Sequence, residues 1–330
     1  MLETAYFPGE SVWRQLTNRL ANGEVMVLVT VARVAGSTPR EVGASMLVGA
    51  SDIAGTIGGG HLEWKAIEHA RTLLDSGKDG SPARQLEKLS LAANLGQCCG
   101  GVAWLLYERI GASDLAGWIP LVTALDNGQG AIRHISHDSA SDWTIGNTLD
   151  PLDAGLNLQD NDWHFSQFLE PASVPLLLFG AGHVGEALVR VLAPTGWPVR
   201  WIDTREQIPS FERPWPACVT TEATDVPEDS IAAAPAGAYY LVMTHRHDLD
   251  LFLAEKILER GDFAYFGMIG SANKRASFTS KLKQRGLDPS RMTCPIGVPG
   301  ISSKLPAAIA IAIATQLLQW QESLAALEPA

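Results

Sequence analysis

Two adjacent cysteines, Cys98 and Cys99, are the most unusual reactive pair in the sequence and lie in the run LGQCCGG at residues 95–101. Cysteines flanked by glycines are expected to be accessible and to face free backbone N–H groups, which favours the thiolate form. Their spacing lacks the C-x-x-C pattern of a structural zinc or thioredoxin-type site, whereas thiolates suit soft, sulfur-liking metals. The alternative is that both are inert, buried residues of a tight turn.

Two polar, glycine-containing loops add groups that could hold a ligand. One, AGSTPREVG at residues 35–43, combines hydroxyl groups with one arginine and one glutamate. The other, GTIGGGHLE at residues 55–63, runs into a predicted helix, and successive N–H groups in such a turn can bind an anion. The ligand-contacting candidates in these loops are Arg40, Gly58, Gly59, His61 and Glu63. Alternatively, Glu63 is only an acidic residue favoured at a helix start by the helix dipole.

A third glycine run, GAGHVG at residues 180–185, has the spacing of a dinucleotide-binding turn. It follows an apolar strand, opens a predicted helix and is followed by Asp203 at the end of the next strand, which is the context that this motif requires. The candidate residues are Gly180 for the tight turn, Gly182 for close phosphate approach, Gly185 for helix packing, His183 between them, and Asp203 for a ribose hydroxyl. We expect a phosphate-containing ligand; the alternatives are a different ligand or none.

Two more turns follow predicted strands in this half of the chain. His245, in THRHD at residues 244–248, is a candidate acid/base or ligand contact, and Asp248 is expected to cap the next helix. Ser271 and Lys274 follow a second glycine turn. Because a lysine in the first turn of a helix opposes the helix dipole, a bound anion would explain it, and an exposed basic turn is the alternative.

The elements that position these residues predict an α/β protein. Residues 1–115 are expected to form an N-terminal α/β domain, with helices at 11–21 and 62–75 and strands at 25–33, 45–48, 52–54, 85–90 and 102–109. Residues 116–171 have a weak pattern and are interpreted as strands plus a linker. Residues 172–330 alternate strands (174–179, 198–202, 217–220, 239–243, 264–269) with helices (186–192, 248–260, 273–285, 306–320), which predicts a Rossmann-like, doubly wound parallel sheet.

Composition excludes several classes of protein. Of the 330 residues, 46% are hydrophobic and 18% charged, which excludes intrinsic disorder, and a net charge of −11 argues against nucleic-acid binding. Four cysteines in a chain of this length do not form a disulfide scaffold. The apolar run at residues 305–318 is too short for a membrane span, and no signal peptide is expected, so we predict a cytoplasmic protein. The low charged fraction is explained by surface hidden in a homo-oligomer or a partner complex, or simply by a large apolar core.

Several motifs together resemble one family. In order along the chain they are GSTPREVGASMLV, GTIGGGHLE, LGQCCGG, LLLFGAGHVGEALVRVLAPTGWPVRWIDTR, THRHDLD, YFGMIGSANKRASF and PIGVPGISSKLPAAIAIAIA. This combination closely resembles the xanthine dehydrogenase accessory protein family (the XdhC/CoxI group). The resemblance covers the chain except for about residues 111–171.

The resemblance implies a chaperone that binds the molybdenum cofactor (molybdopterin) and shields it from oxidation. It further implies help in replacing a molybdenum oxo ligand by sulfide together with a cysteine desulfurase, delivery to apo-xanthine dehydrogenase, and a homodimer. On this basis Cys98 and Cys99 are the expected metal or sulfur-transfer contacts, and His61 and Glu63 line the same cleft between two α/β domains. Many relatives carry cysteine at the position of His61.

Two other functions remain as alternatives. An NAD(P)-dependent oxidoreductase would use Asp203 for ribose and His245 or a cysteine as acid/base, and a protein–protein adaptor would bind no small molecule. The Cys98-Cys99 pair in a glycine turn favours the accessory chaperone over both. Whether the Rossmann half binds molybdopterin phosphate, a separate nucleotide or nothing stays open at this point.

Overall fold

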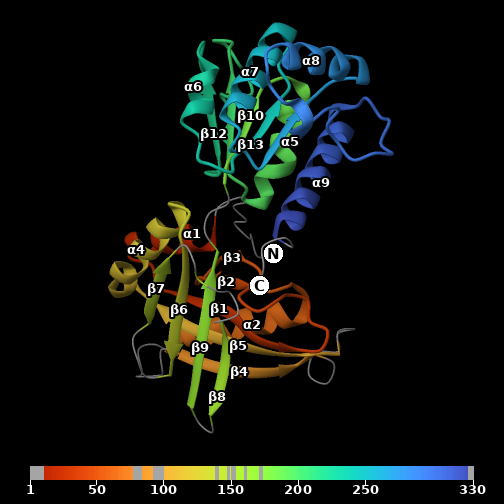
Figure 1. The fold of residues 1–330 in the computed structure, drawn as a ribbon. Helices are drawn as coiled ribbons and strands as arrows, with labels where there is room; N and C mark the ends of the chain where they lie inside the picture. Colours follow the sequence, from red (N-terminus) through yellow and green to blue (C-terminus); the bar gives the residue numbers. More distant parts are fainter. Residues whose placement is uncertain are drawn as a thin grey trace. The chain divides into compact units, whose positions relative to one another are not determined.

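The computed structural model describes residues 11–76, 84–91, 100–137, 141–146, 149, 154–159, 162–170 and 174–325. These residues form two compact units, an N-terminal unit up to residue 170 and a C-terminal unit from residue 174 (Figure 1). Each unit has its own hydrophobic cores and is described by itself.

The N-terminal unit is built on a five-stranded antiparallel sheet. Its strands, in spatial order, are β3 (Ile53–Gly55), β2 (Ser45–Val48), β1 (Met26–Ala35), β5 (Val102–Ile110) and β4 (Arg84–Ser90). The first seven residues of β1 are all buried, because this strand is covered on both faces. Helix α2 (Gly60–Ser76) covers one face and packs Leu62, Ala66 and Leu73 against the sheet.

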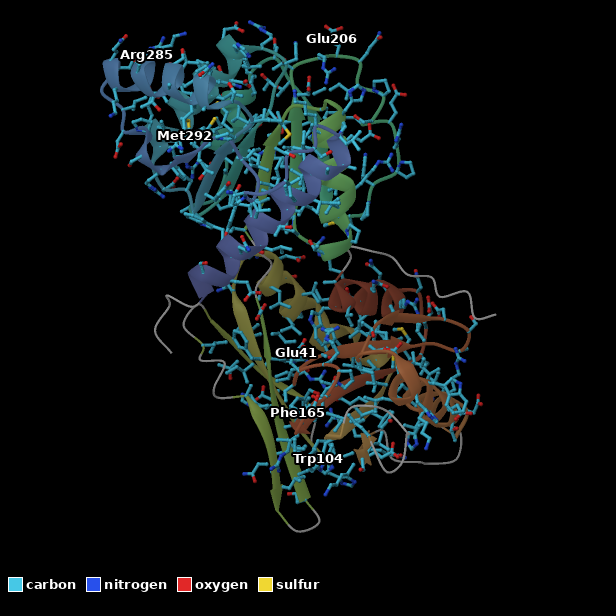
Figure 2. The ribbon with its side chains drawn as sticks, turned by 90° about the vertical axis from the view of Figure 1, so that its right-hand side faces the viewer. Glu41, Trp104, Phe165, Glu206, Arg285 and Met292 are labelled. Carbon is cyan, nitrogen blue, oxygen red and sulfur yellow. The ribbon has the colours of Figure 1, made fainter. Side chains whose placement is uncertain are left out.

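The opposite face is covered by two helices and a second sheet. The helices are α1 (Val12–Ala21) and α4 (Leu115–Asp126), which follows the short 3-10 helix η1 (Ala112–Asp114). The four-stranded antiparallel sheet has the order β7 (Asp142–Gly146), β6 (Gly130–Ser136), β9 (Asp162–Leu169) and β8 (Gly155–Gln159). Buried Trp163 and Phe165 of β9 pack on Ala32 and Leu106 of the first sheet. Figure 2 labels Phe165 among the side chains of this unit.

The described residues of the stretch 116–171 thus form mostly regular structure within the N-terminal unit. It contains helix α4, which was not predicted because Gly117 and Pro120 interrupt the helical pattern of the sequence. The strands of this stretch were expected only in general terms. The other N-terminal elements lie within a few residues of their predicted positions.

The C-terminal unit is a doubly wound Rossmann fold, as predicted. All six strands are parallel: β10 (Leu176–Phe179), β11 (Val199–Asp203), β12 (Val219–Ala223), β13 (Tyr239–Val242), β14 (Tyr265–Met268) and β15 (Met292–Thr293). Their order in space, β12-β11-β10-β13-β14-β15, is the 3-2-1-4-5-6 order of dinucleotide-binding sheets. The chain reverses direction across the sheet between β10 and β13, where such folds bind ligands.

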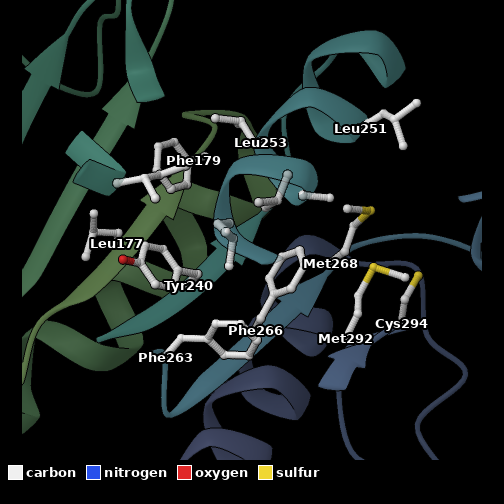
Figure 3. Close-up of a cluster of buried hydrophobic side chains, with 14 of the residues drawn as sticks. Leu177, Phe179, Tyr240, Leu251, Leu253, Phe263, Phe266, Met268, Met292 and Cys294 are labelled. Carbon is white, nitrogen blue, oxygen red and sulfur yellow. The ribbon is translucent and has the colours of Figure 1, made fainter. Parts of the chain in front are cut away.

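Helices cover both faces of this sheet. One core joins the sheet to α5 (His183–Leu192) and α9 (Pro306–Ala325). The other joins it to α6 (Pro227–Ala232), α7 (His247–Arg260) and α8 (Ala272–Gln284), and Figure 3 shows this cluster around Phe179 and Tyr240. Two 3-10 helices, η3 (Ala193–Thr195) and η4 (Pro289–Arg291), complete the unit. No helix in the described part of the chain has the length and hydropathy needed to span a membrane.

Candidate functional site

The N-terminal motif loops contact one another within one unit. Gly101, at the end of the cysteine motif, donates its N–H to the carbonyl oxygen of Ser37 over 3.1 Å. Gly36 has φ +74°, and a Cβ on it would lie 3.2 Å from the Cα of Gly101, so this approach requires glycine. The polar loop and the end of the cysteine motif are therefore packed together. Cys98 and Cys99 themselves lie outside the described residues.

The glycine loop packs against the same polar loop. Gly58 has φ +118°, and a Cβ there would lie 2.6 Å from the Cβ of Pro39 and 3.2 Å from the Cγ of Arg40. Gly59, by contrast, has positive φ, and a Cβ on it would meet nothing within 4 Å. The structure thus brings together three loops that are separate in sequence: residues 36–41, residues 55–60 and the end of the cysteine motif.

The anion-binding turn predicted at residues 55–63 holds a carboxylate of the protein itself. Oε2 of Glu63, in the first turn of α2, accepts hydrogen bonds from the N–H groups of Ile57 (3.0 Å) and Gly59 (3.1 Å) and from the hydroxyl of Thr56. The turn has the donors that the sequence predicted, and Glu63 supplies the anion. A ligand phosphate in this turn would first have to displace Glu63.

Arg40 on the polar loop and the rings of His61 and Trp64 at the start of α2 are candidate ligand contacts. Arg40 is 38% exposed and forms an ion pair with the neighbouring Glu41 at 2.9 Å. This hydrogen bond raises the pKa of Arg40, with a further contribution from the charge of Glu63, and it lowers the pKa of Glu41. Trp64 is 52% exposed, and its ring centroid lies 5.5 Å from that of exposed His61 in an edge-on arrangement. The polar loop thus offers a positive charge, and the first turn of α2 offers two exposed rings.

A residue that the sequence analysis missed anchors the polar loop. Gln167 on β9 is 1% exposed, and its Nε2 donates to the carbonyl oxygen of Gly43 (3.1 Å) and to the Ser45 hydroxyl (3.2 Å). Nothing in the local sequence marks this glutamine, because its partners are more than 120 residues away along the chain. The second sheet therefore helps to position the loop that carries Arg40.

In the C-terminal unit, the three glycines of the fingerprint have three different environments. Gly180 has φ +115°, and a Cβ there would lie 2.3 Å from the carbonyl oxygen of Met243. A Cβ on Gly185 would lie 2.3 Å from the carbonyl oxygen of Gly180, so both are required by the fold. Gly182, before exposed His183 at the start of α5, has φ −84° and nothing within 4 Å of a Cβ. Only Gly182 is therefore not explained by the packing of the protein itself.

Asp203 is held by protein donors at the end of β11. Its Oδ2 accepts from the Ala181 N–H (2.6 Å) and Nη2 of Arg205 (2.8 Å), and its Oδ1 accepts from the N–H (3.0 Å) and Nε (2.8 Å) of Arg205. Burial alone would raise the pKa of Asp203, but the hydrogen bonds from Arg205 and Ala181 outweigh it, and the pKa is lowered. Arg205 was not singled out from the sequence.

A small cavity, partly open to solvent and with room for about one water molecule, lies at the carboxyl ends of β10, β11 and β13. It is lined by Phe179, Ile202, Asp203, Thr204, Pro227, Thr244, His245, Leu249 and Leu253. The structure therefore places Asp203 and His245 together at the point where the strand order reverses, as the fold predicts. The wall is mainly apolar, with polar groups from the ends of β11 and β13.

Lys274 and Ser271 have partners within the protein. Nζ of Lys274 is 2.6 Å from Oδ2 of Asp250, which is fully buried on α7, and also donates to the carbonyl oxygen of Ile269 at 2.9 Å. Ser271 caps α8 by accepting the Lys274 N–H. The lysine in the first helical turn, which suggested a bound anion, is thus balanced by Asp250, a residue the sequence analysis overlooked.

The expected capping role of Asp248 is wrong. Helix α7 begins at His247, and its N-cap residue is Arg246, which makes no side-chain capping bond. Asp248 lies in the first turn and pairs with Arg246, while Thr244 organises the turn by donating its hydroxyl to Asp250 at 2.6 Å. In the parts of the chain described here, no group of three or more His, Cys, Asp and Glu side chains is arranged to hold a metal ion.

Comparison with known proteins places this arrangement in a family. A family model described as the XdhC Rossmann domain matches residues 176–317, and one described as the XdhC and CoxI family matches residues 19–85. A Bacillus subtilis (strain 168) protein described as a probable xanthine dehydrogenase subunit is 25% identical over 93% of this chain and 96% of its own length. An Escherichia coli (strain K12) protein, described as uncharacterized protein YqeB, is 26% identical over 44% of this chain and 27% of its own.

A solved structure shows the same fold. The crystal structure of a xanthine dehydrogenase from Bacillus halodurans aligns with a TM-score of 0.73 over 95% of this chain and 96% of the other, at 21% sequence identity. The two family matches lie in the two units and include the glycine loop of one and the dinucleotide-type turn of the other. The chain therefore belongs to the XdhC and CoxI family.

Proposed function

We propose that this protein is a molybdenum cofactor chaperone for xanthine dehydrogenase. In this role it binds molybdopterin, protects it, assists its sulfuration together with a cysteine desulfurase, and inserts it into apo-xanthine dehydrogenase. The observation that carries the proposal is the contact among the polar loop, the glycine loop and the end of the cysteine motif within the N-terminal unit. The description of the B. subtilis relative as part of a probable xanthine dehydrogenase supports the choice of client.

The residues around these loops fit the parts of molybdopterin. Its phosphate needs a cation, and Arg40 is partly exposed and paired only locally with Glu41 among the ion pairs described. Its flat pterin ring needs an aromatic or apolar face, and Trp64 beside His61 provides one. Its metal needs soft donors, which Cys98 and Cys99 would supply. When bound, the cofactor supplies the molybdenum oxo and sulfido chemistry that the client uses.

Glu63 has a positioning function in this proposal. It occupies the N–H groups of the glycine turn, so the phosphate is assigned to Arg40 and not to that turn. The Glu63 carboxylate also stands near enough to Arg40 to stabilise its positive charge. The loop that carries Arg40 is held from its other end by Gln167.

The Cys98→Ala/Cys99→Ala double variant is expected to lose most of its ability to supply apo-xanthine dehydrogenase with sulfurated cofactor, because both soft donors are removed. The measurements are molybdenum and pterin content after anaerobic purification, and reconstitution of client activity. Cys218→Ala is the matched control, since this half-buried thiol lies in the C-terminal unit and donates to the Ala193 carbonyl oxygen. A double variant that activates the client as well as the unmodified protein does would refute the thiol function.

Arg40→Ala is expected to weaken retention of molybdopterin by about 10- to 150-fold, the equivalent of a lost charge-assisted hydrogen bond. Arg40→Lys should recover part of this loss, because it keeps the charge without the forked geometry. Glu41→Ala is the second control: it breaks the Arg40–Glu41 pair but leaves the cation, so retention should be unchanged or stronger. Equal losses in Arg40→Ala and Glu41→Ala would mean that Arg40 acts only on the shape of its loop.

A further inference from the structure

Three side chains lie next to one another on the first sheet of the N-terminal unit, outside the candidate site. Trp104 on β5 pairs in register with Arg33 of β1 on one side and with Lys88 of β4 on the other. Cζ of Arg33 lies 5.0 Å, and Nζ of Lys88 5.1 Å, from the centroid of the Trp104 ring. Trp104, labelled in Figure 2, is half-buried, whereas both cations are exposed. These three residues are called the basic patch below.

The pleat of β5 directs Trp104 away from helix α2. Its neighbours Ala103 and Leu105 belong to the core that α2 covers, and successive side chains of a strand point to opposite faces. Leu106, the next residue on the face of Trp104, is buried against the second sheet. The basic patch therefore lies beyond the covered part of this face, where the sheet meets solvent.

The two cations of the basic patch have no carboxylate opposite them. Among the residues that the structure describes, neither Arg33 nor Lys88 forms an ion pair, and both contact the Trp104 ring instead. Glu108, on the same face of β5, is buried and already paired with Arg84 and with a buried arginine of β6. In a chain of net charge −11, the patch is thus a local excess of positive charge. Carboxylates from another molecule would complement it.

The basic patch borders the loops of the candidate site. Arg33 lies three residues before the polar loop at residues 36–41, and Trp104 lies three residues after Gly101. Lys88 lies three residues before Leu91, whose N–H donates to the carbonyl oxygen of Gly101 over 3.0 Å. Three residues of a strand span about 10 Å. A protein that takes a ligand from these loops therefore comes within reach of the patch.

We propose that the basic patch docks an acidic surface of apo-xanthine dehydrogenase, with carboxylates of the client on Arg33 and Lys88 and with Trp104 as the apolar centre of the contact. The inference rests on the proposed carrier function, because a client that collects the cofactor has to approach these loops. Tryptophan and arginine are the residues that most often dominate the binding energy of protein interfaces. The ring also restrains the two cations before the client arrives, which reduces the conformational freedom lost on docking.

The test measures docking separately from cofactor transfer. The full-length chain, purified without pterin, is immobilised and titrated with apo-xanthine dehydrogenase, and in parallel with the cysteine desulfurase, at several salt concentrations. Arg33→Glu/Lys88→Glu should weaken binding of the client at least about tenfold and reduce its dependence on salt, because two attractive contacts become repulsive. Arg33→Gln/Lys88→Gln should give a smaller loss, since the charges are removed but not reversed.

Lys281→Glu/Lys283→Glu is the matched control. It changes the net charge by the same amount at two exposed lysines of α8, in the C-terminal unit, and should leave binding of the client within about twofold. Molybdenum and pterin content after anaerobic purification should be the same in Arg33→Glu/Lys88→Glu as in the unmodified protein, because Arg40 is untouched.

Four results would overturn the proposal. They are equal losses of client binding in the two charge-reversed variants, a loss confined to the desulfurase, no binding of the client to the unmodified chain, and a loss of cofactor with client binding intact. The last of these would assign the basic patch to the phosphate of the cofactor. Failure of the carrier function itself is recognised separately, by the absence of molybdenum and pterin from the unmodified protein.

Discussion

Replacing Glu108 by alanine is expected to lower the free energy of unfolding of the N-terminal unit by about 3–5 kcal/mol, because it leaves a buried arginine without its counter-ion. Glu108 on β5 pairs with Arg133 on β6, whose side chain is completely buried, and with Arg84 on β4 at 3.3 Å. Burial lowers the pKa of Arg133, and the positive charge of Arg84 lowers it further, so the cation depends on this carboxylate.

Chemical denaturation followed by tryptophan fluorescence measures this effect directly. The guanidinium of Arg133 lies 5.0 Å from the ring of Trp118 and 5.7 Å from that of Trp143, so these rings report on its surroundings. Asp126→Ala is the control, because it breaks the exposed Arg14–Asp126 pair and should cost no more than about 1 kcal/mol. If Glu108→Ala unfolds at the same denaturant concentration as the unmodified protein, the pair does not join the two sheets energetically.

Asp203→Ala is expected to destabilise the C-terminal unit by about 2–3 kcal/mol even without any ligand, because it leaves the Ala181 N–H and the Arg205 guanidinium without their acceptor. Thermal and urea unfolding of the ligand-free variant measure this loss. Asp248→Ala, at an exposed carboxylate paired with Arg246, is the matched control and should leave stability almost unchanged. A melt of Asp203→Ala that matches the control would mean that the carboxylate does not organise the glycine turn.

The same carboxylate predicts an effect of acid on stability. The pKa of Asp203 is lowered in the folded protein from its ordinary value of 3.8. Its contribution is therefore fully present above the unfolded pKa of about 4 and is lost as the pH falls through the lower, folded pKa. The difference in stability between the unmodified protein and Asp203→Ala should accordingly be constant from neutral pH to about pH 5 and shrink below about pH 4.

The sequence predicts the C-terminal fold well because three central strands, β10, β13 and β14, are short apolar runs with a glycine close by. VPLLLF, YYLV and YFGM stand out without any knowledge of their neighbours, and the glycine fingerprint identifies the first strand and its helix. Helix α6, with six residues, and strand β15, with two, were missed because they are too short to show a period. Strands of a parallel sheet that are buried on both faces appear in the sequence as continuous apolar runs, which indicates a parallel sheet.

The second sheet of the N-terminal unit could not be predicted to the same degree because its identity depends on distant partners. Arg133 and Gln167 are polar residues at buried strand positions, so they weaken the apolar pattern of β6 and β9. Their partners, Glu108 and Gly43, are 25 and 124 residues away along the chain. The sequence shows that the alternation of apolar and polar residues is interrupted at these positions. It does not show the distant hydrogen-bond partners that make the buried polar groups acceptable.

In the candidate site, the charged partners of the predicted residues also could not be identified from the sequence. The sequence predicts a ligand anion in the turn at residues 55–63 and a bound anion beside Lys274. The partners are carboxylates within the chain, Glu63 and Asp250. Asp250 could not be recognised, because an aspartate in the first turn of a helix is ordinarily exposed and favoured there by the dipole.

Because of the Glu63 carboxylate, the conformation of the N-terminal loops does not depend on a bound ligand. Its hydrogen bonds from the N–H groups of Ile57 and Gly59 hold the glycine turn in the folded protein without a ligand, and Pro39 and Arg40 contact that turn at Gly58. Ordering a loop on association ordinarily reduces affinity, since the lost conformational freedom opposes binding. A surface that is already rigid avoids that loss, and it meets its ligand as a preorganised, lock-and-key receptor.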